Sequence, residues 1–246
     1  DAVIEEKDFK QWKFKGSWGV SDEDVFDKAH EVFEGEQQPF FALVFSSSFH
    51  SPFEFPDDRI ELYDEEKSTK FNAVKYADYA IGHYFRKAKQ SSYWDDTIFL
   101  VVADHDERPR GSSLVPVSSY HIPGLIIGAG IEPMIYTKVS SQIDLMPSLL
   151  RLAGISARAP YIGQDIFLRP DGYPGRAMMQ FGNNNAYMVG DQVVIHTPGK
   201  DPLQFVYRDK RLEPTLLNGQ LAGEALAMAL LPGLLYKHKW YRLPPE

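Results

Sequence analysis

Two side chains that can bind a metal ion, Asp104 and His105, follow the apolar run at 97–102 and come directly after Ala103. A carboxylate and an imidazole together suit a divalent ion such as Mn²⁺, Mg²⁺ or Zn²⁺. In an open α/β sheet, ligands bind beyond the carboxyl ends of the strands, so this position favours a metal-binding role. The alternative is that Asp104 caps a turn and His105 is an ordinary polar residue, because two ligands do not complete a site.

Two further histidines stand in loops beside predicted strands. His50 follows the apolar run at 40–45, and in its polar loop it could donate a hydrogen bond to an anionic oxygen, although a plain surface role fits equally well. His121 precedes a strand, so by default it lies at the opposite end of the sheet from the Asp-His pair, unless the long loop at 108–120 carries it back. The other histidines, and the acidic run that begins at Asp22, fit structural or solvent-exposed roles.

Strands and helices must position these side chains, and over residues 1–170 the sequence predicts that the two alternate. Continuous apolar runs predict strands buried on both faces, at 40–45, 97–102 and 125–127. Helical periodicity predicts helices over about 22–33, 68–89 and 140–152, the first of them capped by Ser21. This alternation predicts an α/β layered domain whose central sheet is largely parallel and is flanked by helices.

After about Pro170 the pattern changes to short strands separated by turns. The strand-like runs lie at 177–181, 186–189, 192–196 and 204–207. Turn residues between them predict an antiparallel meander. A helix from about 218 to 231 follows, and Pro232 and Gly233 are expected to end it. The sequence therefore predicts a small subdomain at 171–246, made of an antiparallel sheet and a terminal helix.

The composition narrows the class of protein. The chain has 26 Lys and Arg against 34 Asp and Glu, a net charge of −8, so no basic excess is available for binding nucleic acid. Hydrophobic residues make up 43% and charged residues 24%, the fractions of a globular protein. No apolar run approaches the roughly 18 residues needed to cross a bilayer. The absence of cysteine excludes disulfides, thiolate zinc sites and a cysteine nucleophile.

Five short segments, taken in order along the chain, carry a resemblance to a known family. They are 18–23 (WGVSDE), 49–53 (FHSPF), 102–105 (VADH), 120–127 (YHIPGLII) and 141–150 (SQIDLMPSLL). In this order and spacing they resemble the lipoteichoic acid synthase-like, phosphoglycerol transferase-related branch of the sulfatase/alkaline phosphatase superfamily. The resemblance covers most of the first 170 residues.

The resemblance implies a metal-assisted reaction on an anionic ester. In that family a Thr nucleophile attacks a phosphoester and forms a covalent intermediate, which water or an acceptor alcohol resolves. The family's metal-binding Asp-His pair falls on Asp104 and His105, and its substrate-contacting histidine falls on His50. The resemblance also places His121 near the substrate. Its members are usually anchored in the membrane, with the catalytic domain outside the cytoplasm.

The nucleophile and the first acidic metal ligand of such domains have no counterpart in this sequence, and neither does the Cys/Ser-x-Pro-x-Arg signature of sulfatases. The chain opens at Asp1 without an initiator Met, so we expect the C-terminal part of a catalytic domain from an extracytoplasmic region of an inner-membrane protein. Phosphate and sulfate esters, and hydrolysis and transfer, stay open as alternatives. So does a non-catalytic binding module. The isolated chain is expected to be inactive and to self-associate through exposed apolar surface.

Overall fold

The computed structural model describes residues 2–106, 113–128 and 130–243 of the chain. Its contacts divide into two compact units, Asp1–Thr97 and Ile98–Glu246, which are described separately here. The boundary expected at 170/171 falls inside the second unit and stays a prediction. Among the described residues, no helix has both the length and the apolar character that crossing a bilayer requires.

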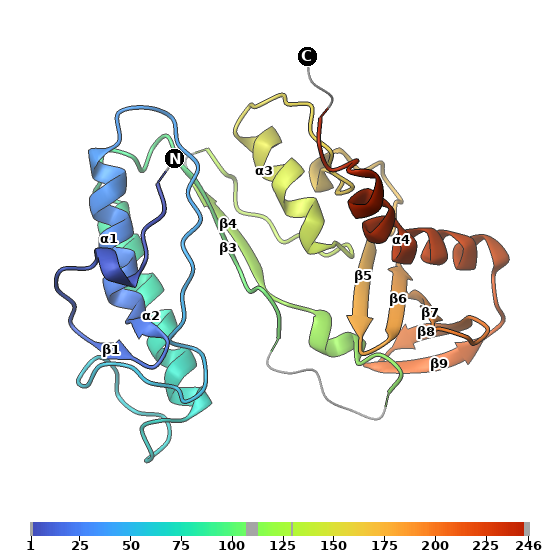
Figure 1. The fold of residues 1–246 in the computed structure, drawn as a ribbon, viewed down its shortest axis with the longest axis horizontal. Coiled ribbons are helices and arrows are strands. Elements are labelled where there is room, and N and C mark those ends of the chain that lie inside the picture. Colours follow the sequence, from blue (N-terminus) through green and yellow to red (C-terminus); the bar gives the residue numbers. More distant parts are fainter. Residues whose placement is uncertain (1, 107–112, 129, 244–246) are drawn as a thin grey trace. The chain divides into compact units, whose positions relative to one another are not determined.

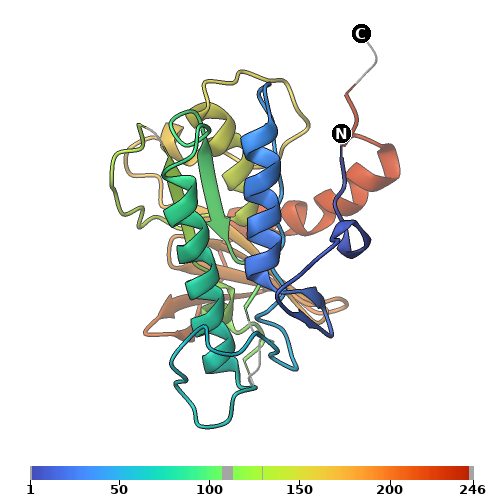
Figure 2. The ribbon, with the colours of Figure 1, turned by 90° about the vertical axis from the view of Figure 1, so that its left-hand side faces the viewer.

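The first unit is built on two helices, α1 (Asp22–Gly35) and α2 (Lys70–Ala88), which lie side by side (Figure 2). The predicted cap is confirmed, because the Ser21 side chain accepts a hydrogen bond from the Asp24 amide. A short turn η1 (Glu6–Asp8) and a small antiparallel pair, β1 (Lys15–Gly16) with β2 (Gly19–Val20), precede α1. The core of this unit is small and aromatic, with Phe55 stacked on Tyr76 at 5.2 Å between ring centroids.

The strand predicted at 40–45 is absent, which corrects the first step of the expected sheet. This run is in no strand or helix, and its large side chains face solvent, with Phe41 75% and Leu43 82% exposed. A strand buried on both faces needs neighbouring strands and covering layers. The described residues of the first unit supply neither at this segment.

The second unit begins with an antiparallel pair, β3 (Ile98–Val102) and β4 (Gly124–Gly128), in which Val102 lies opposite Gly124 (Figure 1). The largely parallel central sheet that the sequence predicts is therefore not seen among the described residues. Parallel neighbours need a crossover connection, usually a helix. The described residues between β3 and β4 contain only the four-residue turn η2 (Val117–Tyr120). A second turn, η3 (Gln142–Asp144), leads into helix α3 (Leu145–Leu152), and η4 (Ile166–Leu168) follows.

The predicted small antiparallel sheet is confirmed as a meander of five strands in sequence order. They are β5 (Arg176–Phe181), β6 (Asn184–Val189), β7 (Gln192–His196), β8 (Leu203–Arg208) and β9 (Arg211–Thr215). Side chains alternate between the two faces of a strand. Val193 accordingly packs in a cluster with Val115 and Val117, whereas its neighbour Val194 packs in the cluster that contains Ala222.

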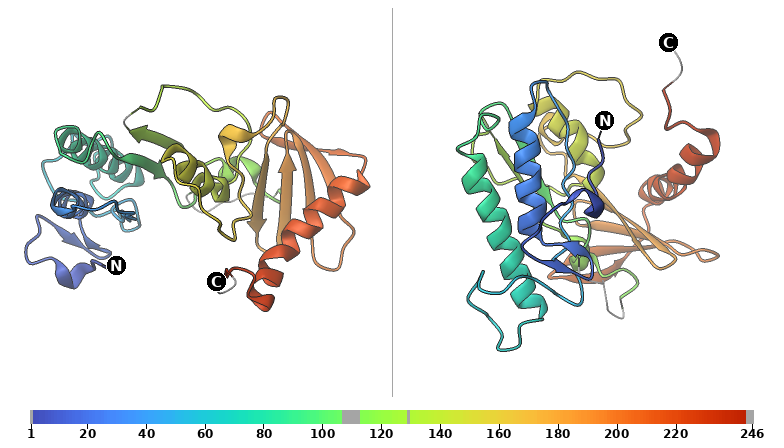
Figure 3. Two further views of the ribbon diagram at one scale, coloured as in Figure 1. Left: turned by 90° about the horizontal axis from the view of Figure 1, so that it is seen from above. Right: turned by 60° about the vertical axis from the view of Figure 1, so that its left-hand side comes forward.

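The helix that follows, α4 (Gly219–His238), covers one face of this sheet (Figure 3). It begins at the predicted position, with the Asn218 side chain accepting from the Leu221 amide. It does not end at Pro232, which corrects the sequence prediction. Proline removes a single intrahelical donor, and the residues beyond it form a further turn that closes at Lys239, whose amide bonds to Leu235 and Tyr236.

Candidate metal and substrate site

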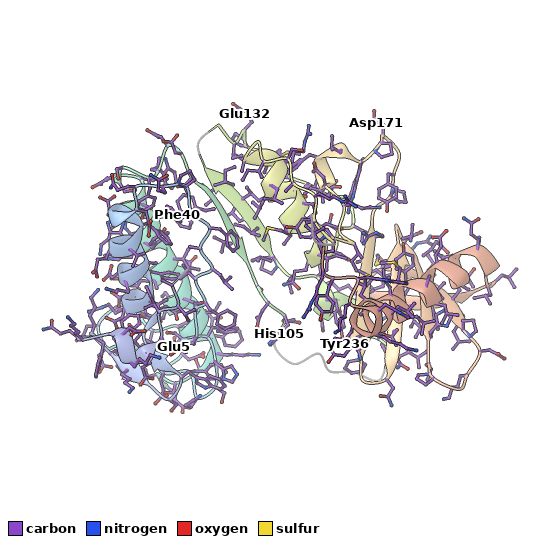
Figure 4. All side chains as sticks on the ribbon, turned by 45° about the horizontal axis from the view of Figure 1, so that its top comes forward. Glu5, Phe40, His105, Glu132, Asp171 and Tyr236 are labelled. Atoms are coloured by element: carbon purple, nitrogen blue, oxygen red, sulfur yellow. The ribbon has the colours of Figure 1, made fainter. Side chains whose placement is uncertain are left out.

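The metal-binding candidates Asp104 and His105 lie just beyond the end of β3, and Figure 4 labels His105 there. The apolar sequence of β3 pairs along its whole length with β4, and the ladder reaches Ala103, whose amide lies 3.5 Å from the Pro123 carbonyl oxygen. Asp104 and His105 are therefore the first two residues after the paired backbone ends. This confirms the sequence-based placement of the pair at the carboxyl end of a strand.

The side chains of the pair face each other. One polar atom of each side chain is hydrogen-bonded to the backbone, and the other points toward its partner in the pair. Asp104 Oδ1 accepts the His105 amide at 2.9 Å, and His105 Nδ1 lies 2.8 Å from the Asp106 carbonyl oxygen. Because a carbonyl can only accept, Nδ1 carries the proton and donates. This leaves Asp104 Oδ2 and His105 Nε2 facing each other at 3.3 Å. Histidine metal ligands are commonly held in this way, with the second ring nitrogen bonded to a carbonyl.

The spacing of the two atoms fits a shared metal ion. Two ligand atoms that each lie about 2.1 Å from one ion are separated by about 3.0 Å at an octahedral angle and about 3.4 Å at a tetrahedral angle. The observed 3.3 Å falls between these values. Both side chains are more than half exposed, and no group of three or more His, Asp or Glu in the described part of the chain could hold a metal. The spacing of the pair is therefore compatible with two ligands of one ion, and the described residues do not complete a ligand set.

Gln142 fixes the backbone on which the pair stands. Its side-chain Nε2 donates to the carbonyl oxygens of Ala103 and Asp104, at 2.9 and 3.1 Å. Gln142 is held in turn by a capping box, in which the Ser141 amide donates to Asp144 Oδ2 at 2.9 Å. The start of α3 is thus tied to the end of β3 by one side chain.

Asp144 anchors this helix start inside the second unit. Its carboxylate is fully buried and forms ion pairs with Arg169 at 2.5 Å and with Arg176 at 3.3 Å. It also accepts the Gln164 amide at 2.8 Å. A buried charge is tolerated when it is paired and hydrogen-bonded. The sequence-based default for Asp144, capping or ion pairing, is confirmed.

His121 lies at the same end of the β3–β4 pair as Asp104, which corrects the default expectation. That expectation assumed parallel strands, in which the start of one strand lies far from the end of its neighbour. In the antiparallel pair, the residues before Gly124 run beside the residues after Val102. The reversal of strand direction, rather than a long loop, brings His121 to this end.

His50 belongs to the first unit, where it lies in a tight turn against Trp18. The two ring centroids are 3.8 Å apart, and Trp18 Nε1 and His50 Nδ1 lie 2.8 and 3.0 Å from the same Ser51 carbonyl oxygen. Phe53, with a left-handed φ of 64°, closes the turn by donating its amide to the His50 carbonyl at 2.7 Å. These contacts orient the ring and leave Nε2 as the atom that can reach a ligand.

The loop that carries His50 is anchored by a buried carboxylate, which corrects the solvent-exposed role expected for the acidic run at Asp22. Asp22 is fully buried at the start of α1, and its Oδ1 accepts the amides of Ser47 and Ser48, both at 2.9 Å. Its neighbour Glu23 is also buried and accepts from Arg59 Nε at 2.8 Å. The start of α1 thus holds in place the loop that carries His50, a candidate substrate-binding residue.

The hollow beside this loop is small. Its volume is about 10 Å³, and His50, Trp18, Ser17 and Glu54 are among the residues that line it. Such a space holds about one water molecule. Hydrogen bonds from Ser17 keep the pKa of the Glu54 carboxyl below its ordinary value, so this carboxyl is ionised at neutral pH. This hollow therefore offers polar atoms on a small, water-sized space.

Sequence reasoning singled out Asp104, His105, His50 and His121 as candidates, and it did not point to Gln142 as a supporting residue. The structure brings the first two into contact and places His121 at the same end of the strand pair, while His50 belongs to the other unit. Gln142 lies inside one of the five segments that carry the family resemblance, at 141–150, so that segment marked the region. Its contact with two carbonyls, however, leaves no signal in residue types or spacing.

Comparisons with known proteins agree with this picture. A family model described as Sulfatase matches residues 1–155. The lipoteichoic acid synthase-like protein YvgJ of Bacillus subtilis is 24% identical over 165 residues, which cover 58% of this chain and 27% of that protein. Phosphoglycerol transferase I of Xanthomonas axonopodis pv. citri is 26% identical over 171 residues, covering 66% of this chain and 24% of that protein. The chain thus spans about a quarter of the length of these relatives.

A solved structure gives a closer match. A protein in the alkaline phosphatase superfamily from Vibrio parahaemolyticus is 45% identical and superposes with a TM-score of 0.94, covering 98% of this chain and 60% of that one. The segments that carried the resemblance, the family model and this structure point to the same group. The chain belongs to the Sulfatase family, in the lipoteichoic acid synthase-like branch of the alkaline phosphatase superfamily.

Proposed function

We propose that this chain supplies the Asp-His part of a divalent-metal site in a hydrolase or transferase of phosphate or sulfate esters. The observation that carries the proposal is the 3.3 Å separation of Asp104 Oδ2 and His105 Nε2 at the end of β3. Membership of the Sulfatase family supports ester chemistry. The names of the relatives, a lipoteichoic acid synthase-like protein and a phosphoglycerol transferase, support a phosphoglycerol-type substrate from the cell envelope.

Each residue has a defined role in this proposal. Asp104 and His105 bind the ion, and Gln142 holds their backbone in place. A bound divalent ion supplies positive charge that stabilises developing charge on the ester oxygens and acidifies a nucleophilic hydroxyl. We propose that this hydroxyl, a threonine by family resemblance, and the remaining metal ligands belong to segments outside these 246 residues.

The two further histidines would contact the substrate. Because Nδ1 of His50 donates to the Ser51 carbonyl, the ring can offer a second donor, Nε2–H, to an anionic oxygen only as an imidazolium. His121, at the same end of the strand pair as the metal ligands, would contact the ester held by the ion there. We place the reaction outside the cytoplasm, on the surface of an inner-membrane protein, with the lipoteichoic acid synthase and phosphoglycerol transferase relatives as support.

An Mn²⁺ titration of the chain tests whether Asp104 and His105 bind a divalent ion. Mn²⁺ broadens the NMR signals of nearby nuclei, so titration of the ¹⁵N-labelled chain is expected to broaden the amides of residues 103–106 first. The variants Asp104→Asn and His105→Gln should abolish this selective broadening. Asp171→Asn, which changes an exposed carboxylate in the same unit, should retain it. Equal broadening in the wild type and in the Asp104 and His105 variants would show that the pair does not bind the ion.

Catalysis is tested separately in a longer protein that carries this chain. There, Asp104→Ala is expected to cost several kcal/mol of transition-state stabilisation, seen as a fall of about a thousandfold or more in phosphoester or sulfoester turnover. Retained turnover with unchanged metal affinity would refute the metal role. Metal binding without turnover of either ester would instead favour a non-catalytic binding module.

A further inference from the structure

Helix α4 packs on the sheet through Leu221, Ala222, Ala225 and Met228, and it presents a separate row of leucines to solvent. Ala222 and Ala225 are buried against Tyr187 and Val194. The leucines at 226, 230 and 234 are exposed, with Leu230 55% exposed. Their spacing of four residues places them in one stripe along the helix. A surface helix usually turns its large apolar side chains to the core, so this second row of leucines is left uncovered by the described residues.

The end of α4 holds aromatic and basic side chains close together. Lys239 adopts a left-handed conformation with φ 56°, and the Trp240 amide donates back to the Leu235 carbonyl at 3.0 Å. This closure is the one that glycine usually makes, so lysine here carries a steric cost. It brings the Trp240 ring onto His238, with 4.8 Å between centroids, while the Arg242 guanidinium lies 5.5 Å from the Tyr241 ring.

The charge of this segment is opposite to that of the chain. Between Glu224 and Glu246 the sequence has no acidic residue but has three bases, Lys237, Lys239 and Arg242, in a protein of net charge −8. Helix α4 is apolar on all sides rather than amphipathic, and its exposed leucines lie beside Trp, Tyr, Lys and Arg, residue types that gather where a membrane meets water. The bases suit anionic headgroups.

We propose that the second half of α4, together with residues 239–243, binds the surface of an anionic phospholipid bilayer. The leucine stripe enters the boundary of the acyl chains, Trp240 and Tyr241 lie at the level of the headgroups, and the three bases contact lipid phosphates. A second copy of the chain is a poorer occupant. A symmetric contact through this segment would bring together two cationic surfaces that have no acidic residue to pair with. The proposal does not depend on the metal pair.

Co-sedimentation of the full chain with vesicles tests the apolar part of the proposal. We expect binding to vesicles of phosphatidylethanolamine and phosphatidylglycerol. Leu230→Glu should lower the partition coefficient about tenfold or more, because it removes an inserted side chain and adds a repelled charge. Ile135→Glu makes the same change at a residue that is 88% exposed elsewhere in the unit, and it should have little effect. Circular dichroism checks that both variants are folded.

Separate variants test whether the basic residues contact anionic lipid. Lys237→Gln and Lys239→Gly should each weaken binding to the anionic vesicles about fivefold, and glycine suits the left-handed position. Neither should change the weaker binding to phosphatidylcholine vesicles, and Lys200→Gln, at an exposed turn, serves as the control. The proposal is wrong if the wild-type chain does not bind anionic vesicles, or if Leu230→Glu and Ile135→Glu behave alike. It is also wrong if Leu230→Glu only dissolves a dimer seen by sedimentation velocity.

Discussion

The side-chain amide of Gln142 lies 3.1 Å from the carbonyl oxygen of Asp104 and 2.9 Å from that of the preceding residue. One residue therefore fixes the direction in which the chain leaves β3. Because Asp104 Oδ1 is also bonded to the next amide, the position of Oδ2 follows from the position of the backbone. The geometry of the candidate metal pair is therefore set by Gln142, just before α3, as much as by the pair itself.

Gln142→Glu is expected to release this backbone. The substitution keeps the size of the side chain but replaces its donor by an oxygen that the two carbonyls repel. Amide hydrogen exchange at residues 103–106 should become faster, and Mn²⁺ affinity should fall about tenfold, as for other residues that support metal ligands. Gln180→Glu, on an exposed position of β5, is the matched control. Exchange rates that are the same in the two variants would contradict the role of Gln142.

Asp22→Ala is expected to free the loop that carries His50. The buried carboxylate accepts the amides of Ser47 and Ser48, so its removal leaves one partly buried and one buried donor without their acceptor. Hydrogen bonds to a charged group contribute about 1.5–3 kcal/mol each, and we expect urea unfolding to show a loss of about 3 kcal/mol. The NMR shifts of the His50 ring should also move, as its contact with Trp18 loosens. Glu31→Ala, at an exposed position of α1, should change neither.

Local elements of this fold could be predicted from the sequence, because each depends on neighbouring residues. Periodicity and caps located α1, α2 and α3, and alternation with turns located the meander of β5–β9. Sheet pairing depends instead on residues far apart in sequence. The sequence predicted β3 and β4 as strands but not their antiparallel pairing, and it predicted a buried strand at 40–45 where the structure has an exposed segment in no strand or helix.

The candidate site divides in the same way. Asp104 and His105 could be predicted because their chemistry and their position after an apolar run are local features. The position of His121 at the same end of the strand pair as Asp104 could not be predicted, because it depends on strand direction. The burial of Asp22 could not either, since an acidic run at a helix start is usually solvated. The amides that donate to the Asp22 carboxylate, those of Ser47 and Ser48, lie about 25 residues away in sequence.

Asp144→Ala is expected to destabilise the second unit strongly. The change leaves two buried guanidinium groups, those of Arg169 and Arg176, without their counter-ion. Removing one partner of a buried ion pair costs about 3–5 kcal/mol, and urea unfolding measures this loss. Asp171→Ala removes an exposed carboxylate and should stay within about 0.5 kcal/mol of the wild type. Equal stability of the two variants would show that the buried cluster is not the anchor of α3.

The pH dependence of the first unit should depend on Asp27. Partial burial alone would raise the pKa of this carboxyl, but hydrogen bonds from Lys13 and Lys87 outweigh it and hold the pKa below its ordinary value. Lys13 Nζ lies 2.7 Å from Asp27 Oδ2, and His83, whose pKa is lowered mainly by its own partial burial, lies 4.0 Å from Oδ1. These contacts join the segment before α1 to α2.

A carboxyl with a lowered folded-state pKa stabilises the fold above its unfolded pKa of about 4, and the contribution disappears as the pH falls through the lower folded value. The free energy of unfolding of the wild-type chain should therefore fall between about pH 5 and pH 3. Asp27→Asn should have a lower free energy of unfolding at neutral pH, and that free energy should fall less on acidification. Urea unfolding at a series of pH values measures both. Asp78→Asn, at an exposed position of α2, should follow the wild-type curve. If Asp27→Asn follows it too, the ion pairs of Asp27 do not stabilise this unit.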